Sequence, residues 1–231
     1  MRPHTLCLVA AILGSAAITC AAQNQLDAAE RAAGWTLLFD GQTFDGWRGY
    51  PNAPIAGWEV QDGTLHAIAK SKGVALVTTK KYSDFELTWE WKLPRAGNNG
   101  VKYFVTEARP SAPGHEYQMI DDAENPDAQT SALRLTAAFY DVLPAAADKP
   151  LKPVGEWNSS KIVVRGNHVE HWLNGQQVLA YELGSAAVKA GLAKSKFAKE
   201  PGFGEKIAGN IMLTYHSDDC WFRAIKVREL K

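Results

Sequence analysis

Residues 84–93 read DFELTWEWKL, and this stretch decides the fold class. Its apolar side chains stand at every second position and alternate with polar or charged ones. A period of two over this length is typical of a β-strand with one buried face, because successive side chains of a strand point to opposite sides of the sheet. The side chains that we expect to face inward are Phe85, Leu87, Trp89 and Trp91.

A second clear β-unit spans residues 161–181. Within it, Asn174-Gly175 separates two apolar runs, and this dipeptide favours the positive φ angles of a two-residue hairpin turn. Further strands are expected at Trp58–Val60, Thr64–Ala69, Val101–Thr106, His115–Ile120, Ile211–Tyr215 and Trp221–Glu229. Many short strands separated by Gly, Pro and Asn turns predict an all-β protein of two packed antiparallel sheets. Residues 184–206 lack strand character and are expected to form a long loop with a short helix at 185–194.

The composition narrows the classes of partner. The chain has 231 residues, with 25 Lys and Arg against 25 Asp and Glu. This length suits one domain of the larger β type. A net charge of zero without a run of five like charges argues against a nucleic-acid partner, which would be held by phosphate neutralisation. The chain also shows no phosphate-binding glycine loop, no zinc-type His and Cys spacing and no nucleophile elbow.

The first 22 residues have the pattern of an export signal. The basic Arg2 precedes the apolar stretch 6–18, and small residues allow cleavage after Ala22. The expected location is therefore outside the cytoplasm, in a bacterial periplasm. Cys20 gives an alternative, in which a lipid on its thiol holds the chain at a membrane surface.

The mature chain is expected to be one domain over residues 34–231, preceded by an N-terminal tether or short helix at 23–33. Cys220 is then the sole cysteine, so no internal disulfide is expected. Because Trp221 and Phe222 follow it, we interpret Cys220 as a packed core thiol and not as a nucleophile.

The most suggestive stretch for chemistry is 114–122, which reads GHEYQMIDD. Glu116, Gln118 and Ile120 share one face of the expected strand. Two adjacent polar side chains can form hydrogen bonds with sugar hydroxyls, and one carboxylate can serve as a base or an acid. The alternative interpretation is a solvated outer face of the sheet.

Other candidate residues each have a structural alternative. His216 shares a strand face with Thr214, but a lone histidine is more often structural than catalytic. Asn98-Asn99-Gly100 also suits a plain hairpin turn, and Lys102 also suits a surface charge. Asn158 belongs to a Glu-Trp-Asn stretch that also suits an ordinary loop beside a core Trp.

Taken in order, these stretches resemble one family, the 3-keto-disaccharide hydrolases, also described as 3-keto-glucoside 1,2-lyase/3-keto-2-hydroxy-glucal hydratase domains. The resemblance covers Gly34 to Leu230. The matching stretches are GWTLLFDG (34–41), GW (46–47), WEVQDG (58–63), YSDFEL (82–87), NNGVKY (98–103), EYQMIDD (116–122), GEWN (155–158), HWLNG (171–175), KSKF (194–197) and WFR (221–223).

The resemblance implies a concanavalin-A-like, laminarinase-type antiparallel β-sandwich, or jelly roll. It also implies a carbohydrate partner, a glycoside already oxidised to a ketone at C3. Such a ketone acidifies the C2 hydrogen, so that a base can remove it and the glycosidic oxygen at C1 can leave. Addition of water across the resulting double bond completes a net hydrolysis. This route needs a base, a group that stabilises the enolate and an acid, and not the paired carboxylates of ordinary glycosidases.

The resemblance nominates site residues without deciding which is base and which is acid. They are Glu116 or His216 for base or acid, Lys102 and Gln118 as donors to the enolate oxygen, and Asn98, Tyr140 and Asn158 as substrate contacts. No cofactor is required by the sequence; a divalent metal can stabilise an enolate, but no ligand set is evident. The oligomeric state is left open.

Two departures from the family pattern favour a rival hypothesis. Where the family often has Gln-Asp before the last histidine, this chain has Thr214-Tyr215, and Ala224 replaces a frequent Asn. These changes favour a non-catalytic carbohydrate-binding module on the same sandwich. An ordinary glycosidase is a third hypothesis, but it requires a Glu-x-Asp-x-Glu strand, and the chain offers Glu116-x-Gln118-x-Ile120.

Overall fold

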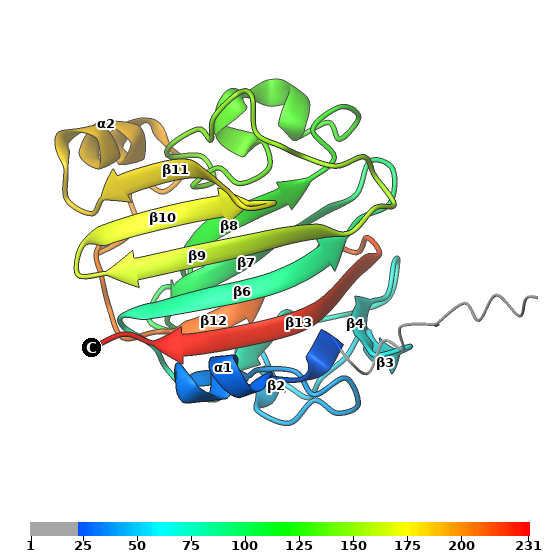
Figure 1. Ribbon diagram of the computed structural model, residues 1–231. Helices are drawn as coiled ribbons and strands as arrows, with labels where there is room; N and C mark the ends of the chain where they lie inside the picture. The colour runs from blue at the N-terminus through cyan, green and yellow to red at the C-terminus, as the bar shows by residue number, and fades with distance from the viewer. Residues whose placement is uncertain (1–22) are drawn as a thin grey trace, which may run out of the picture.

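The alternating stretch forms strand β6 (Phe85–Lys92) in the interior of a large sheet (Figure 1). The computed structural model describes residues 23–231. Within β6, Phe85, Leu87, Trp89 and Trp91 are each at most 2 % exposed. The prediction that these four side chains face inward is therefore confirmed.

The larger sheet has eight strands in the order β11-β10-β9-β6-β13-β4-β3, with β1 pairing with β13. Its other strands are β1 (Trp35–Leu37), β3 (Trp58–Gln61), β4 (Thr64–Ala67), β9 (Asn158–Arg165), β10 (His168–Leu173), β11 (Gln176–Glu182) and β13 (Cys220–Glu229). The hairpin expected at Asn174-Gly175 joins β10 to β11, with φ angles of 46° and 85° at its two residues. These positive angles match the twist of the paired strands.

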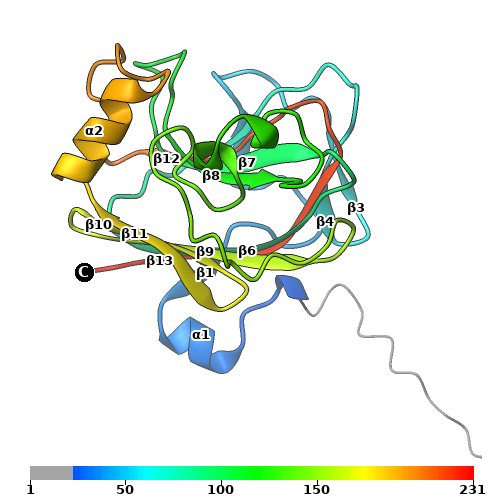
Figure 2. The same ribbon diagram turned by 90° about the horizontal axis from the view of Figure 1, so that it is seen from above.

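The smaller sheet has five strands in the order β2-β5-β12-β7-β8. They are β2 (Trp47–Gly49), β5 (Leu76–Thr78), β7 (Asn98–Val105), β8 (His115–Ile120) and β12 (Asn210–Leu213). Every strand pair in both sheets is antiparallel. Figure 2 shows the two sheets as stacked layers, so the predicted all-β, concanavalin-A-like sandwich is confirmed.

The core between the two layers is aromatic. Trp89 of the larger sheet meets Tyr117 of the smaller one edge to face, with ring centroids 5.0 Å apart. Tyr117 also accepts a hydrogen bond of 2.9 Å from Ser160 across the layers. Cys220 is fully buried with a free thiol, as expected of a core residue.

Helices occupy only the margins of the sandwich. The α-helices are α1 (Ala28–Ala32) and α2 (Ala186–Lys194), and 3₁₀ turns cover Ala128–Thr130 and Ala132–Arg134. Helix α2 begins at Ser185, whose side chain accepts from the Val188 amide, and it lies at one end of the sandwich (Figures 1 and 2). In the part of the chain that the structure describes, no helix has the length and apolar character needed to cross a bilayer.

The stretch 23–33, expected as a tether or a short helix, contains α1 and is joined to the sandwich by side-chain bonds. Asn24 donates to the Gly63 carbonyl at 2.8 Å and accepts from the Ala224 amide at 2.9 Å. The expected signal peptide at 1–22 and the lipidation site at Cys20 lie outside the described residues.

One local interpretation is wrong. Asn98-Asn99-Gly100 does not form a hairpin turn but begins strand β7, where it pairs with the end of β8. The dipeptide Asn-Gly favours a turn only when the chain must reverse there, and here the reversal occurs later, between Val105 and His115. In this extended form, Asn98 and Gly100 lie on the strand face of Lys102, and Asn99 lies on the opposite face.

Candidate active site

Strand β8 carries different chemistry on its two faces. Tyr117 and Met119 enter the core between the sheets, whereas Glu116 and Gln118 lie on the opposite face and are 6 % and 1 % exposed. A following segment covers the edge of β8, since the Tyr140 amide donates to the Glu116 carbonyl at 3.1 Å. The alternative interpretation of this face as a solvated surface is therefore wrong.

Register brings Lys102 beside Glu116. Lys102 and Glu116 are direct partners in the β7–β8 pair, so their side chains leave the sheet on the same face. The Lys102 Nζ lies 3.4 Å from Glu116 Oε2, and the His216 Nε2 lies 4.0 Å from Oε1. The structure thus brings three of the predicted residues together. Gly100 leaves space for the Glu116 carboxylate, because a Cβ at that position would stand 2.3 Å from Glu116 Oε1.

The three side chains differ in their access to solvent. The Glu116 side chain is 7 % exposed, that of Lys102 18 % and that of His216 40 %. Burial raises the pKa of the Glu116 carboxyl, but the charge of Lys102, with a smaller effect of the nearby His216, outweighs it and lowers the pKa to about 2. Glu116 is therefore a buried, permanently ionised carboxylate, while His216 is the group of the three that a substrate meets most readily.

A structured corner holds His216 in place just beyond the end of β12. The Thr214 amide donates to the Gly100 carbonyl at 2.9 Å, and its hydroxyl donates to Asn99 Oδ1 at 3.0 Å. The Tyr215 hydroxyl lies 2.8 Å from the Ile68 carbonyl oxygen. Thr214 and Tyr215, which depart from the family pattern, therefore fix the backbone that leads into His216.

Gln118 and Asn98 lie next along the same face. The Gln118 Nε2 donates to Asn98 Oδ1 at 3.3 Å, which places these two predicted residues side by side. The Gln118 Oε1 is buried and has no hydrogen-bond partner among the described residues. Because a buried polar atom is normally paired, this oxygen is suited to accept a hydrogen bond from a ligand hydroxyl. As placed, Gln118 offers an acceptor there, and not the donor that the sequence suggested.

Tyr140 borders the cluster, but its hydroxyl is engaged. It donates to Asp127 Oδ2 at 2.8 Å, and burial together with this bond raises the pKa of the phenol. Lys196 lies over Tyr140, with its Nζ 4.4 Å from the centre of the ring. The sequence pattern assigns no role to Lys196, although the residue falls within the stretch 194–197 that matches the family.

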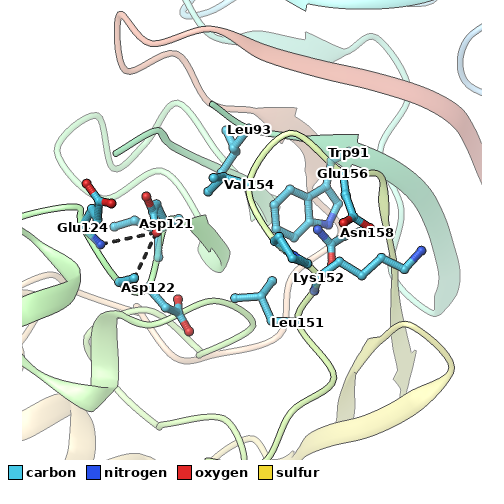
Figure 3. Close-up of a pocket in the computed structure, with 13 residues that line it drawn as sticks. Trp91, Leu93, Asp121, Asp122, Glu124, Leu151, Lys152, Val154, Glu156 and Asn158 are labelled. Atoms are coloured by element: carbon cyan, nitrogen blue, oxygen red, sulfur yellow. Dashed lines mark hydrogen bonds between the residues drawn. The ribbon is translucent and has the colours of Figure 1, made fainter. Parts of the chain in front are cut away.

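Asn158 does not join the cluster. It stands on β9 of the larger sheet, where its Oδ1 accepts from the Lys152 amide at 3.0 Å and from Asn174 Nδ2 at 2.8 Å. It lines a separate hollow of about 370 Å³ between the sheets and the loop at 151–156 (Figure 3). Its amide oxygen bonds to the chain itself, so the predicted substrate contact at Asn158 lies apart from the Glu116 cluster and stays a prediction.

The described residues do not offer a metal site. Within 23–231, no three His, Cys, Asp or Glu side chains gather as ligands of a metal ion would. The one carboxylate of the cluster, Glu116, is engaged by Lys102. The donor set around Glu116 therefore does not fit a divalent ion held by the protein.

Comparisons with known proteins agree with this geometry. A family model described as the 3-keto-alpha-glucoside-1,2-lyase-like domain matches residues 34–228. A 3-keto-disaccharide hydrolase of Bacteroides thetaiotaomicron is 33 % identical, over 95 % of this chain and 87 % of that protein.

Two solved structures from Parabacteroides distasonis ATCC 8503, each described as a putative glycosyl hydrolase, are also similar. The first has 33 % identity and a TM-score of 0.82, and covers 90 % of this chain and 99 % of that one. The second has 28 % identity and a TM-score of 0.68, and covers 85 % and 99 %. The family match spans both sheets and every residue of the Glu116 cluster. This chain therefore belongs to the family of 3-keto-alpha-glucoside-1,2-lyase-like domains.

Proposed function

We propose that the protein hydrolyses glycosides oxidised to a ketone at C3, by elimination across C1 and C2 followed by hydration. The observation that carries the proposal is a buried carboxylate, Glu116, flanked by Lys102 and His216. With Lys196 nearby, the site holds more positive than negative charge. A site of this kind favours an intermediate that gains negative charge, as an enolate does.

The arrangement fits elimination better than ordinary glycoside hydrolysis. An ordinary glycosidase uses two carboxyl groups that flank the scissile bond. Here Glu116 is the one carboxylate on its strand face, and its ionic partners are Lys102 and His216. The name of the Bacteroides relative supports the same substrate class, since that protein is a 3-keto-disaccharide hydrolase.

His216 is our choice for the proton-transfer group. Its side chain is 40 % exposed and can approach C2 of a bound sugar, whereas Glu116 is buried and has a pKa of about 2, which makes it a weak base. His216 removes the C2 proton, and the electron pair of that C–H bond forms the C2–C3 double bond of the enolate. When the enolate collapses, the C1–O bond breaks and the leaving oxygen takes up the proton that His216 holds. Water then adds at C1 and a proton returns to C2.

Glu116 has a supporting part in this scheme. Its charge holds the Lys102 ammonium on the face where the substrate binds, and it stabilises the imidazolium that His216 becomes after taking the proton. We propose export as the location of this activity, on the basis of the signal-like residues 1–22.

The test uses a 3-keto-disaccharide beside its unoxidised parent. Purified protein should release sugar from the keto form and leave the parent intact. Release from the parent would indicate an ordinary glycosidase, and binding of either sugar without release would indicate a carbohydrate-binding module. Either result would overturn the proposal.

A pair of histidine variants tests the role of His216. His216→Asn should lower turnover by about 10²-fold or more, the usual scale for loss of a general base. His168→Asn is the matched control, because His168 is 41 % exposed beside Glu170 and Glu182 on the other sheet. Its turnover should equal that of the wild type, and an equal loss in both variants would contradict the assignment.

A further inference from the structure

A second lysine reaches the site from a segment far along the chain. Lys196 follows helix α2, and its backbone amide donates to Asp141 Oδ2 at 2.8 Å. Asp141 Oδ1 accepts in turn from Arg134 Nε at 3.1 Å. Asp141 is the neighbour of Tyr140, whose own amide bonds to the Glu116 carbonyl. The backbone of Lys196 is thereby tied to the segment at 140–141, which bonds to β8.

The ammonium of Lys196 is free to bind an oxygen. Its Nζ lies 4.4 Å from the centre of the Tyr140 ring and 5.2 Å from that of Phe197, and the residue is solvent-exposed. Among residues 23–231 no carboxylate forms an ion pair with it, in contrast to Lys102, which is paired with Glu116. A lysine ammonium has three N–H donors. Those of Lys196 lie beside aromatic rings and not beside carboxylate oxygens.

The charges around Glu116 also support a role for Lys196 in binding a negatively charged oxygen. The Lys196 Nζ lies 4.4 Å from the ring centre of Tyr140, and the Tyr140 amide donates to the Glu116 carbonyl at 3.1 Å. The charge of Lys102, and to a smaller extent that of Lys196, lowers the pKa of the Glu116 carboxyl. One carboxylate neutralises one lysine. The remaining ammonium, that of Lys196, matches the single negative charge of an enolate.

We propose that Lys196 is the cation that binds the C3 oxygen of the substrate as that oxygen becomes an enolate. This inference rests on the proposed elimination and assigns one of its required parts to a residue outside the β7–β8 pair. A positive donor aimed at the oxygen lowers the barrier to loss of the C2 proton, because the charge that develops on C3–O is stabilised where it forms.

The segment that carries Lys196 is anchored from the core. Phe197 stacks on Phe203 with ring centroids 4.2 Å apart, and the Gly204 amide donates to His115 Nε2 at 3.0 Å. Burial lowers the pKa of His115 to about 3, so the imidazole is neutral and can accept this bond. His115 precedes Glu116 on β8 and points to the opposite face. One strand therefore supplies the carboxylate and also the residue that positions the Lys196 loop.

The experiment compares three lysine variants on the 3-keto-disaccharide. Lys196→Met should lower kcat by about 10²–10³-fold, the range for loss of one oxyanion donor, with KM within a few fold of the wild type. Lys196→Arg keeps the charge and should recover at least ten-fold of that loss. Lys199→Met, an exposed lysine on the same segment, should leave kcat and KM unchanged.

A structural role for Lys196 predicts a different result. If the residue only supported its loop, Lys196→Arg would fail to rescue kcat, and the thermal midpoint would fall together with kcat. Either that pattern or a kcat of Lys196→Met within three-fold of the wild type would refute the assignment. Wild-type protein that releases no sugar would instead overturn the proposed function, and this inference with it.

Discussion

Gly100→Ala is a small substitution with a calculable effect on the candidate site. The added Cβ would stand 2.3 Å from Glu116 Oε1 and 3.0 Å from Cδ, whereas ordinary contacts begin at 3.4 Å. The carboxylate must therefore retreat by about 1 Å, and the 3.4 Å and 4.0 Å distances to Lys102 and His216 cannot both be kept. A displacement of this size at a reacting centre can lower turnover by about 10²-fold.

The same substitution should change stability only slightly. Lengthening the Lys102–Glu116 distance from 3.4 Å by about 1 Å loses about 1 kcal/mol at an effective dielectric constant of 20. Replacing glycine by alanine within a strand gains about 0.5–1 kcal/mol, because the unfolded chain loses conformational freedom. The two effects nearly cancel, so we expect a large loss of kcat with a thermal midpoint close to that of the wild type.

A double variant decides whether the clash with Glu116 is the cause. Glu116→Asp shortens the side chain by one methylene group and removes the closest contact with the new Cβ. In the Gly100→Ala background it should therefore cause at least ten-fold less additional loss of kcat than it causes alone. Fully multiplicative losses, wild-type activity in Gly100→Ala, or unfolding of that variant would each refute the reasoning.

Other predictions concern stability and are checked by urea unfolding. The pKa of Glu116 is lowered from 4.5 to about 2, so its ionisation stabilises the fold fully above pH 4.5, and this contribution, on the order of 3 kcal/mol, is lost as the pH falls toward 2. Glu116→Gln should show a shallower decline over that interval, and equal slopes for variant and wild type would contradict the ion pair. Trp89→Ala should lower the free energy of unfolding by about 3–5 kcal/mol, because Trp89 is 1 % exposed and leaves a cavity. Val154→Ala, at a side chain 46 % exposed, should change it by less than about 0.5 kcal/mol, and comparable losses in the two variants would argue against the core described above.

The two antiparallel sheets were predictable from local pattern, whereas the concanavalin-A-like arrangement was implied by the family resemblance. The period of two in residues 84–93 predicts a strand with one buried face, and Asn174-Gly175 between two apolar runs predicts a hairpin turn. Asn98-Asn99-Gly100 shows where local reasoning fails. Its glycine is needed by a tertiary contact, since the Glu116 carboxylate occupies the space of a side chain. Nothing within the tripeptide carries that information.

The site was predictable to the extent that it lies on paired strands. The shared face of Glu116 and Gln118 follows from strand periodicity, whereas Lys102 and Asn98 were implied by the family resemblance, and the β7–β8 register places them beside that face. Lys196 arrives on a loop that is placed by Asp141 and His115, contacts that no local pattern reveals. The separation of Asn158 from the cluster was not predictable either, because it depends on β9 belonging to the other sheet.

The most direct test of the account follows the hydrogen at C2. Elimination across C1 and C2 must break the C2–H bond, whereas a glycosidase that attacks C1 leaves it intact. A 3-keto-disaccharide deuterated at C2 is incubated with the protein in ordinary water, and the released keto-sugar is analysed by mass spectrometry. Free deuterated 3-keto-sugar, incubated with the protein in parallel, corrects for exchange after release. The account predicts product that has lost its deuterium, formed about 10²-fold more slowly by His216→Asn; product that retains the label would contradict the elimination route.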